Sequence, residues 1–195
     1  MSTRNEQPTN GRDGWQYGVA AEKKPRRTTL DLCIAAMLIA LTFAFTFINI
    51  KLPITGSGGL IHLGNIPLVV AAIVFSRRHA AVAGAFGMSL FDVAGGWLAW
   101  APFTFVIRAA MGFLIGLIAQ ARGGKNIALN VAAVLAGGAV MLVGYYFTEV
   151  ILYGNFVTPF LSVPGNALQV ASAVLIGIPV AAALKKIRLP GTARD

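Results

Sequence analysis

The sequence predicts an all-α integral membrane protein, a bundle of six transmembrane helices with both termini in the cytoplasm. Of its 195 residues, 56% are hydrophobic and only 12% are charged, whereas an average soluble domain carries about 25% charged residues. The mean hydropathy is +0.72. A soluble fold has no place to bury so much apolar surface, so the solvent for most of this chain is a lipid bilayer.

Six apolar stretches are long enough to cross the hydrocarbon core, which is about 30 Å thick, at a helical rise of about 1.5 Å per residue. Glycine, proline or charged residues bound each stretch, as expected at helix ends. The second and third stretches are the shortest. The six expected helices span residues 30–50, 60–76, 80–96, 102–121, 127–151 and 165–184.

The basic residues predict the orientation, because lysine and arginine in short loops stay on the cytoplasmic side. Alternate connections carry them, and the opposite connections contain only Lys51. The formal net charge of +9 therefore reflects topology in the cell membrane, and nucleic acid is not expected as a partner. The basic clusters are Lys23 to Arg27, Arg77 with Arg78, Arg122 with Lys125, and Lys185 to Arg188.

The chain is predicted to contain one membrane domain, residues 30–185, flanked by two tails. Residues 1–29 are polar and basic, with several prolines and glycines, which is typical of a disordered cytoplasmic tail. Residues 186–195 form a second cytoplasmic tail. The first apolar run is long and has no clear cleavage site behind it, so it is interpreted as a retained helix and not as a signal peptide.

No catalytic machinery is recognisable. The sequence has no Gly-x-Ser-x-Gly elbow and no phosphate-binding glycine loop, and its single cysteine, Cys33, excludes a thiolate metal site. Ser89 lacks a histidine base on the same side of the bilayer. We therefore expect no enzyme activity, no metal and no cofactor.

Two charged residues in the third and fourth predicted helices need a reason, because a charge at the bilayer centre costs about 2.5–3.5 kcal/mol even on lenient scales. Asp92 and Arg108 lie on consecutive helices, each one or two turns below the outer loop that joins them. They are expected to pair. An ion pair between helices and a ligand contact are both open interpretations, and the two are compatible.

A third acidic residue, Glu149, follows Tyr145 by four residues on the fifth predicted helix, so both lie on one face. An aromatic ring beside a carboxylate suits a flat, polar, nitrogen-containing heterocycle. The alternative is an acid that reaches the outer interface beside tyrosines of the aromatic belt. The same alternative applies to Trp97, Trp100 and Phe156, because aromatic residues generally gather at membrane interfaces.

A stripe of small residues on the first predicted helix is a candidate surface for docking of a protein partner. Ala36, Ala40 and Ala44 recur at a spacing of four, and such stripes let another helix approach closely. The spacing alone does not separate a partner protein from packing within the bundle.

Three motifs together resemble the substrate-binding S components of energy-coupling factor (ECF) vitamin transporters, most closely the branch for pyridoxine, hydroxymethylpyrimidine and related compounds. The similarity covers about residues 30–185, and Arg108 stands where lysine is common. The motifs are Ile61-His62-Leu63-Gly64-Asn65, Gly84-x-x-Gly87-Met88-x-Leu90-x-Asp92-x-x-x-Gly96-Trp97, and Ala101-Pro102-x-Thr104-Phe105-x-Ile107-Arg108-x-x-x-Gly112-x-x-x-Gly116.

The resemblance implies a bundle that binds a vitamin or precursor near its outer face, under the first, third and fifth loops. It also implies docking on a transmembrane coupling subunit driven by two cytoplasmic ATPases, with the alanine stripe as the docking surface, and a tilting movement that delivers the substrate inward. The rival functions are a self-sufficient channel or exporter and, less favoured, an intramembrane enzyme. The implied substrate site comprises His62, Asn65, Asp92, Trp97, Arg108, Tyr145, Glu149, Asn166 and Gln169.

Two members of this set, Asn166 and Gln169, begin the sixth predicted helix at its outer end. Uncharged amides there can recognise ring nitrogens or hydroxyls. The alternative for Asn166, and likewise for Asn65 ahead of the second helix, is a helix N-cap, because asparagine is favoured in that position.

Overall fold

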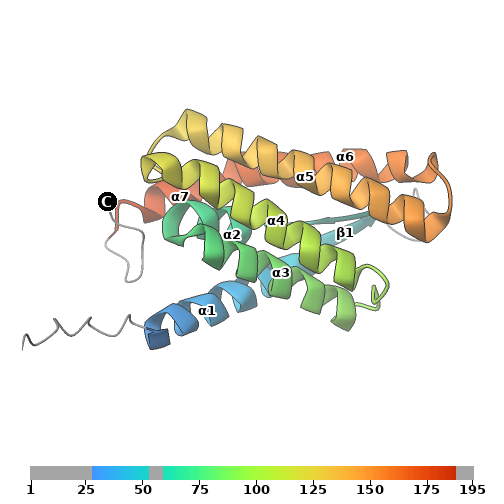
Figure 1. Cartoon of the computed structure of the whole chain (residues 1–195), viewed down its shortest axis with the longest axis horizontal. Helices are drawn as coiled ribbons and strands as arrows, with labels where there is room; N and C mark the ends of the chain where they lie inside the picture. Colours follow the sequence, from blue (N-terminus) through green and yellow to red (C-terminus); the bar gives the residue numbers. More distant parts are fainter. Residues whose placement is uncertain (1–27, 53–58, 188–195) are drawn as a thin grey trace, which may run out of the picture.

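The computed structural model describes residues 28–52 and 59–187, and within them the chain is almost wholly helical (Figure 1). The long helices are α1 (Thr28–Phe47), α3 (Arg77–Ala94), α4 (Ala101–Ala119) and α5 (Ile127–Tyr153). Shorter turns complete the bundle. They are α2 (Asn65–Val70), η1 (Ala71–Phe75), η2 (Gln120–Arg122), η3 (Thr158–Ser162), α6 (Val163–Ser172), η4 (Ala173–Gly177) and α7 (Ile178–Leu184).

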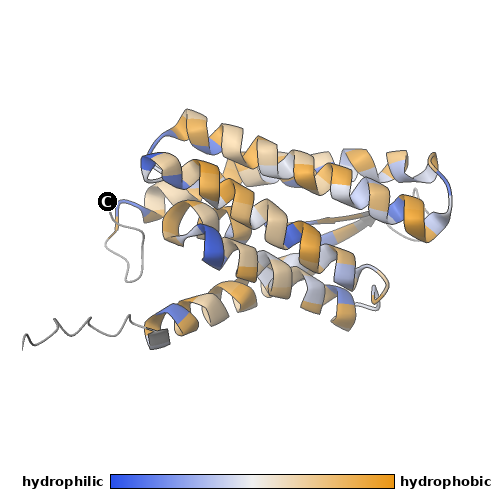
Figure 2. Cartoon of the chain, in the orientation of Figure 1, coloured by the Kyte–Doolittle hydropathy of each residue, from blue (hydrophilic) through white to orange (hydrophobic). Residues whose placement is uncertain are grey.

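These helices correspond in order to the six predicted helical segments: α1, α2 with η1, α3, α4 with η2, α5, and α6 with η4 and α7. Four helices in the described part of the chain are long and apolar enough to cross a membrane, and apolar residues cover their surfaces (Figure 2). The predicted all-α, six-helix class is confirmed. Most of residues 1–29 and 186–195 lie outside the described residues, so the disordered tail at 1–29 and the cytoplasmic tail at 186–195 stay predictions.

The second predicted helix, 60–76, is wrong at its start. Strand β2 (Gly59–His62) pairs antiparallel with β1 (Asn49–Leu52), and His62 lies opposite Asn49. Helix α2 begins only at Asn65, with Gly64 as its N-cap. A short apolar run does not distinguish a strand from a buried helix by its pattern, and here pairing with the chain that leaves α1 selects the strand.

The segment formed by α2 and η1 is buried along its whole length, from Asn65 to Phe75. Helix α2 has six residues and η1 has five. Together they rise only about 16 Å, which is too little to cross the membrane. Gln120 satisfies carbonyls near its end, because the Nε2 group donates to the oxygens of Ala72 at 2.9 Å and Ile73 at 3.0 Å. This apolar segment therefore fills the bundle interior below the outer loops.

Helices α3 and α4 pack closely because glycines remove side chains from their contact. A Cβ atom at Gly112 would lie 2.5 Å from the Ala80 carbonyl oxygen, and one at Gly84 would lie 2.9 Å from that of Arg108. Small residues permit such approach of helix backbones in membranes. The close packing holds Asp92 on α3 and Arg108 on α4 in fixed relative positions.

The basic residues gather at one end of the bundle. Lys185 Nζ donates to the Gly123 carbonyl, and a Cβ atom at Gly116 would meet the backbone of Arg77. Helix α1 begins and α7 ends at this same end (Figure 1). The arrangement agrees with a cytoplasmic location of both termini under the positive-inside rule.

Cysteine labelling tests this orientation. In a Cys33→Ala background, Leu98→Cys lies on an exposed outer loop and Lys186→Cys at the exposed basic end. An impermeant maleimide added to intact cells should label the cysteine at 98 and should reach the cysteine at 186 only after permeabilisation. The opposite labelling pattern would invert the topology.

Candidate substrate-binding site

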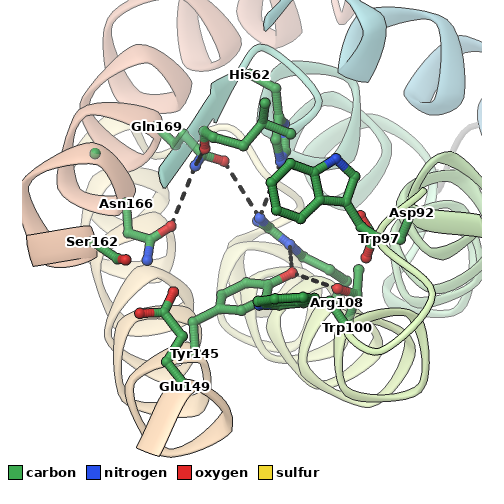
Figure 3. Close-up of a pocket in the computed structure, with 13 residues that line it drawn as sticks. His62, Asp92, Trp97, Trp100, Arg108, Tyr145, Glu149, Ser162, Asn166 and Gln169 are labelled. Carbon is green, nitrogen blue, oxygen red and sulfur yellow. Dashed lines mark hydrogen bonds between the residues drawn. The ribbon is translucent and has the colours of Figure 1, made fainter. Parts of the chain in front are cut away.

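A cavity of about 60 Å³ lies among β2, the α3–α4 loop, α4, α5 and α6 (Figure 3). It is small beside the roughly 300–1,000 Å³ of pockets for drug-sized ligands. All the predicted site residues except Asn65 line it. The lining residues are Leu60, His62, Asp92, Trp97, Trp100, Thr104, Arg108, Tyr145, Glu149, Ser162, Gly165, Asn166 and Gln169.

Arg108 lies at the centre of the site and is 1% exposed. Its Nε group donates to the Tyr145 hydroxyl at 3.1 Å, and its Nη1 group donates to Asn65 Oδ1. Its Nη2 group lies 3.4 Å from both Gln169 Oε1 and His62 Nε2. The guanidinium carbon is 5.0 Å from the centre of the Tyr145 ring, within cation–π range. Neutral side chains thus hold the buried charge in place.

The expected direct pair between Arg108 and Asp92 is wrong, since no salt bridge joins them in the described part of the chain and the hydrogen bonds of Arg108 go elsewhere. Two hydroxyls connect them instead. The Tyr145 hydroxyl accepts from Arg108 and donates to Thr104 Oγ1 at 3.0 Å, and the Thr104 side chain faces the Asp92 carboxyl. The guanidinium reaches toward β2 and α6 (Figure 3), so the two charges share the cavity without closing on each other.

Two buried carboxyl oxygens in the cavity, Asp92 Oδ2 and Glu149 Oε2, have no hydrogen-bond partner among the described residues. Glu149 is 3% exposed. Ser162 faces it, yet Ser162 Oγ is also buried without a partner. Leaving a buried polar atom unsatisfied costs about 1–3 kcal/mol, so these oxygens are the positions where a bound ligand would restore missing hydrogen bonds.

Both predicted amides lie within α6, whose N-cap is Ser162, so the capping alternative for Asn166 is wrong. Gln169 is 1% exposed, and its Nε2 group donates to the Leu60 carbonyl at 2.8 Å and to Asn166 Oδ1 at 3.3 Å. Gln169 therefore ties α6 to strand β2. Its Oε1 atom remains directed toward Arg108.

Asn65 lies beneath the cavity instead of lining it. The residue is fully buried as the first residue of α2, and Gly64 occupies the N-cap position, so the capping alternative for Asn65 is also wrong. Its side-chain oxygen accepts from Arg108. Asn65 is thus a support for the arginine.

His62 closes the same side of the cavity from strand β2 and is 6% exposed. Its Nδ1 atom accepts from the Gly64 backbone N–H at 3.2 Å. Burial lowers the pKa of His62 well below its usual range, and the nearby positive charge of Arg108 lowers it further. The imidazole is therefore neutral at physiological pH.

Aromatic rings complete the cavity wall. Trp97 and Trp100 meet edge to face at 5.4 Å, and Trp100 meets Tyr153 at 6.1 Å. Trp97, Trp100 and Tyr145 all line the cavity (Figure 3). Trp97 and Trp100 are therefore not only residues of an aromatic belt at the membrane interface, because both also line the cavity.

Five lining residues were not predicted as site members. Thr104 could have been found, because it precedes Arg108 by four residues on the same helical face. Ser162 and Gly165 enter through η3 and the first turn of α6, a turn geometry with no periodic sequence signal. Leu60 enters through the strand that was predicted as a helix.

The alanine stripe faces outward. Ala36, Ala40 and Ala44 are all exposed. Ala36 and Ala40 line an apolar groove between α1 and the end of α3, together with residues such as Phe43 and Leu90. Packing within the bundle, the alternative interpretation of the stripe, is therefore wrong for the described residues.

Removal of one hydroxyl tests the connection between Arg108 and Thr104. Tyr145→Phe leaves the Arg108 Nε–H and Thr104 Oγ1 without their shared partner, so the free energy of unfolding should fall by about 1–3 kcal/mol. The neighbouring Tyr146→Phe is the matched control, because that hydroxyl bonds only to the Phe156 carbonyl at an exposed position. Equal losses in thermal or denaturant unfolding of the two variants would contradict the structural role.

Comparison with known proteins gives consistent results. The family model for the ECF-type riboflavin transporter S component matches residues 26–186. An uncharacterized protein of Pyrococcus woesei is 31% identical over 143 residues, 72% of this chain and 93% of that protein. The thiamine precursor transporter HmpT of Lactococcus lactis subsp. cremoris is 31% identical over 128 residues, 63% of this chain and 69% of HmpT.

A solved structure of the S component of a bacterial ECF transporter has the same fold. The TM-score is 0.63 at 17% identity, over 82% of this chain and 98% of that one. The match to the family model covers most of the chain and the fold agrees. The chain therefore belongs to the family of ECF-transporter S components, which are membrane-embedded transport subunits and not enzymes.

Proposed function

We propose that this chain is the substrate-binding subunit of an ECF-type importer for a vitamin or vitamin precursor with a single heterocyclic ring, of the pyridoxine or hydroxymethylpyrimidine kind. The observation that carries the proposal is a pair of buried carboxyl oxygens, on Asp92 and Glu149, that find no hydrogen-bond partner in the described part of the chain and lie in a cavity walled by aromatic rings. A flat ring with polar substituents supplies what these groups lack: donors for the carboxyl oxygens and a face for the aromatic side chains.

The size of the cavity favours one ring over several. The family model carries the name of riboflavin and the Lactococcus relative that of a thiamine precursor. Riboflavin has three fused rings and a sugar-alcohol chain, whereas the thiamine precursor hydroxymethylpyrimidine has one ring. The small size of the cavity, about 60 Å³, is the reason to favour the smaller class.

Within this proposal the site residues divide by chemistry. Tyr145 and Trp97 offer ring faces, Glu149 and Asp92 accept hydrogen bonds from substrate donors, and the amides of Asn166 and Gln169 recognise ring nitrogens or hydroxyls. Arg108 supplies the fixed positive charge around which the site is arranged. Asn65 acts through Arg108 and does not contact the substrate.

The bundle interior supports a binding subunit over a self-sufficient channel. Below the cavity the α2–η1 segment presents Leu68, Val69, Ile73 and Val74, each 0% exposed. A conducting path needs polar groups or water along its length, and this apolar segment offers neither. Import by such a chain requires an energised partner: the transmembrane coupling subunit and the two ATPases of an ECF complex, with Ala36, Ala40 and Ala44 as the docking surface.

Glu149→Gln tests the substrate site. The change keeps size and helix packing but removes the charge, so affinity for hydroxymethylpyrimidine or pyridoxine should fall by about 2 kcal/mol or more, because hydrogen bonds to charged groups contribute about 1.5–3 kcal/mol. Isothermal calorimetry measures the loss, and Asp31→Asn on the exposed start of α1 is the matched control. Unaltered affinity with a lower melting temperature would assign Glu149 a structural role.

Ala40→Trp tests the docking surface. A bulky ring on the exposed stripe should prevent close helix approach, so the variant should lose copurification with the coupling subunit and lose uptake while its substrate affinity stays unchanged. Ala110→Trp on the exposed face of α4 introduces the same ring elsewhere. Normal transport by Ala40→Trp, or a loss of substrate binding as severe as the loss of uptake, would refute the docking role.

A further inference from the structure

His62 has a hydrogen-bond donor on each side of its ring. The Gly64 backbone N–H lies 3.2 Å from Nδ1, and Arg108 Nη2 lies 3.4 Å from Nε2. A neutral imidazole carries one N–H and one acceptor nitrogen. It therefore cannot accept from both neighbours.

The backbone side of this conflict is fixed. Gly64 is buried as the N-cap of α2, and a Cβ atom there would lie 2.5 Å from Thr46 Oγ1 and 3.1 Å from Met88 Cε. The Gly64 N–H donates to Nδ1 from this tightly packed turn, so Nδ1 is the acceptor and Nε2 carries the hydrogen. A ring protonated on both nitrogens would place an N–H against the Gly64 N–H and a second positive charge beside Arg108.

On the opposite side of the His62 ring, two hydrogen-bond donors therefore face each other. The Nε2–H of His62 and the Nη2 group of Arg108 lie 3.4 Å apart. That Nη2 group also lies 3.4 Å from Gln169 Oε1, a length at which a hydrogen bond contributes little. Both side chains line the cavity and are more than nine-tenths buried. An acceptor atom placed between them would satisfy both.

We propose that His62 determines substrate specificity by donating its Nε2–H, together with Arg108 Nη2, to one acceptor atom of the substrate. This inference rests on the proposed binding function. The carboxyl oxygens of Asp92 and Glu149 lie on other sides of the same cavity (Figure 3) and accept from donors of the same molecule. The site thus selects a flat ring with an acceptor on one edge and amino or hydroxyl donors on the others.

This arrangement rejects analogues by leaving buried groups unpaired. A site built to hydrogen-bond a substrate atom discriminates strongly against an analogue that lacks the atom, whereas an apolar pocket discriminates weakly. The acceptor is a ring nitrogen or a hydroxyl oxygen. Removal of that one atom should cost more affinity than removal of an apolar substituent of similar size.

The experiment measures binding of hydroxymethylpyrimidine and pyridoxine to the purified full chain by calorimetry. Two kinds of analogue accompany them: deoxy compounds with methyl in place of hydroxymethyl, and compounds with a ring CH in place of a ring nitrogen. The variants are His62→Leu, which removes the donor, and His62→Gln, whose amide nitrogen supplies an N–H at the same reach. His79→Leu changes the other described histidine, which bonds to Ser76 at the opposite end of the bundle.

The expected result is a loss of about tenfold or more in affinity for the parent compound in His62→Leu, the size of one buried hydrogen bond. His62→Gln should recover most of this loss, and His79→Leu should bind normally. In addition, His62→Leu should no longer distinguish the parent from the one analogue that lacks the acceptor. If His62→Leu does not fold, the same comparison of parent and analogue in His62→Gln decides, because a retained donor must retain the discrimination.

Other outcomes overturn the inference. Normal affinity in His62→Leu would show that the histidine does not contact the substrate, and equal losses in the Leu and Gln variants would show that shape matters and the N–H does not. In both cases binding to the wild-type chain would leave the proposed function standing. If no single-ring compound binds the wild-type chain, the proposed function fails and the donor role of His62 fails with it.

Discussion

A buried, permanently charged guanidinium is the feature on which the rest of this structure depends. Arg108 cannot lose its charge, so the elements around it must supply hydrogen-bond acceptors or water. Helices α2, α5 and α6 bring it the side-chain oxygens of Asn65, Tyr145 and Gln169, and strand β2 places the neutral ring of His62 beside it. The strand and the short helix that interrupt an otherwise regular bundle thus both contribute to the surroundings of this one side chain.

The same arrangement keeps opposite charges apart. Arg108 and Asp92 are joined through Tyr145 and Thr104 and not directly, so the carboxyl group keeps an oxygen free for another donor. A closed ion pair would satisfy both groups internally and leave a substrate little to gain. An open site is less stable alone but gains on binding: a ligand at 100 times its dissociation constant stabilises the folded state by about 2.7 kcal/mol. The unsatisfied atoms are thus compatible with a binding protein that is completed by its substrate.

Hydropathy and charge predicted the helices and their direction, because the length of an apolar run and the side of its basic flanks are local properties. The shared face of Tyr145 and Glu149 followed from helical spacing for the same reason. The partners of Arg108 could not be predicted, since the direction of a long side chain depends on which helices surround it. Strand β2 was missed because it depends on pairing with β1, which the local apolar pattern of residues 59–62 does not reveal. Ser162 became part of the cavity through η3, a short 3₁₀ turn that packs against α5 and leaves no periodic pattern in the sequence.

The bundle combines an outer cavity with an interior that is closed. Beneath Arg108 the α2–η1 segment is largely apolar and buried, and Gln120 donates to its Ala72 and Ile73 carbonyls. A substrate in the cavity therefore meets packed side chains and not a path inward. Under the proposed function, release into the cell then requires that the whole bundle move relative to the membrane, because rearranging its core would disrupt the packing that holds Arg108. Such a movement needs a partner that grips an exterior surface, and the exposed alanine stripe on α1 offers one that lies outside the binding machinery.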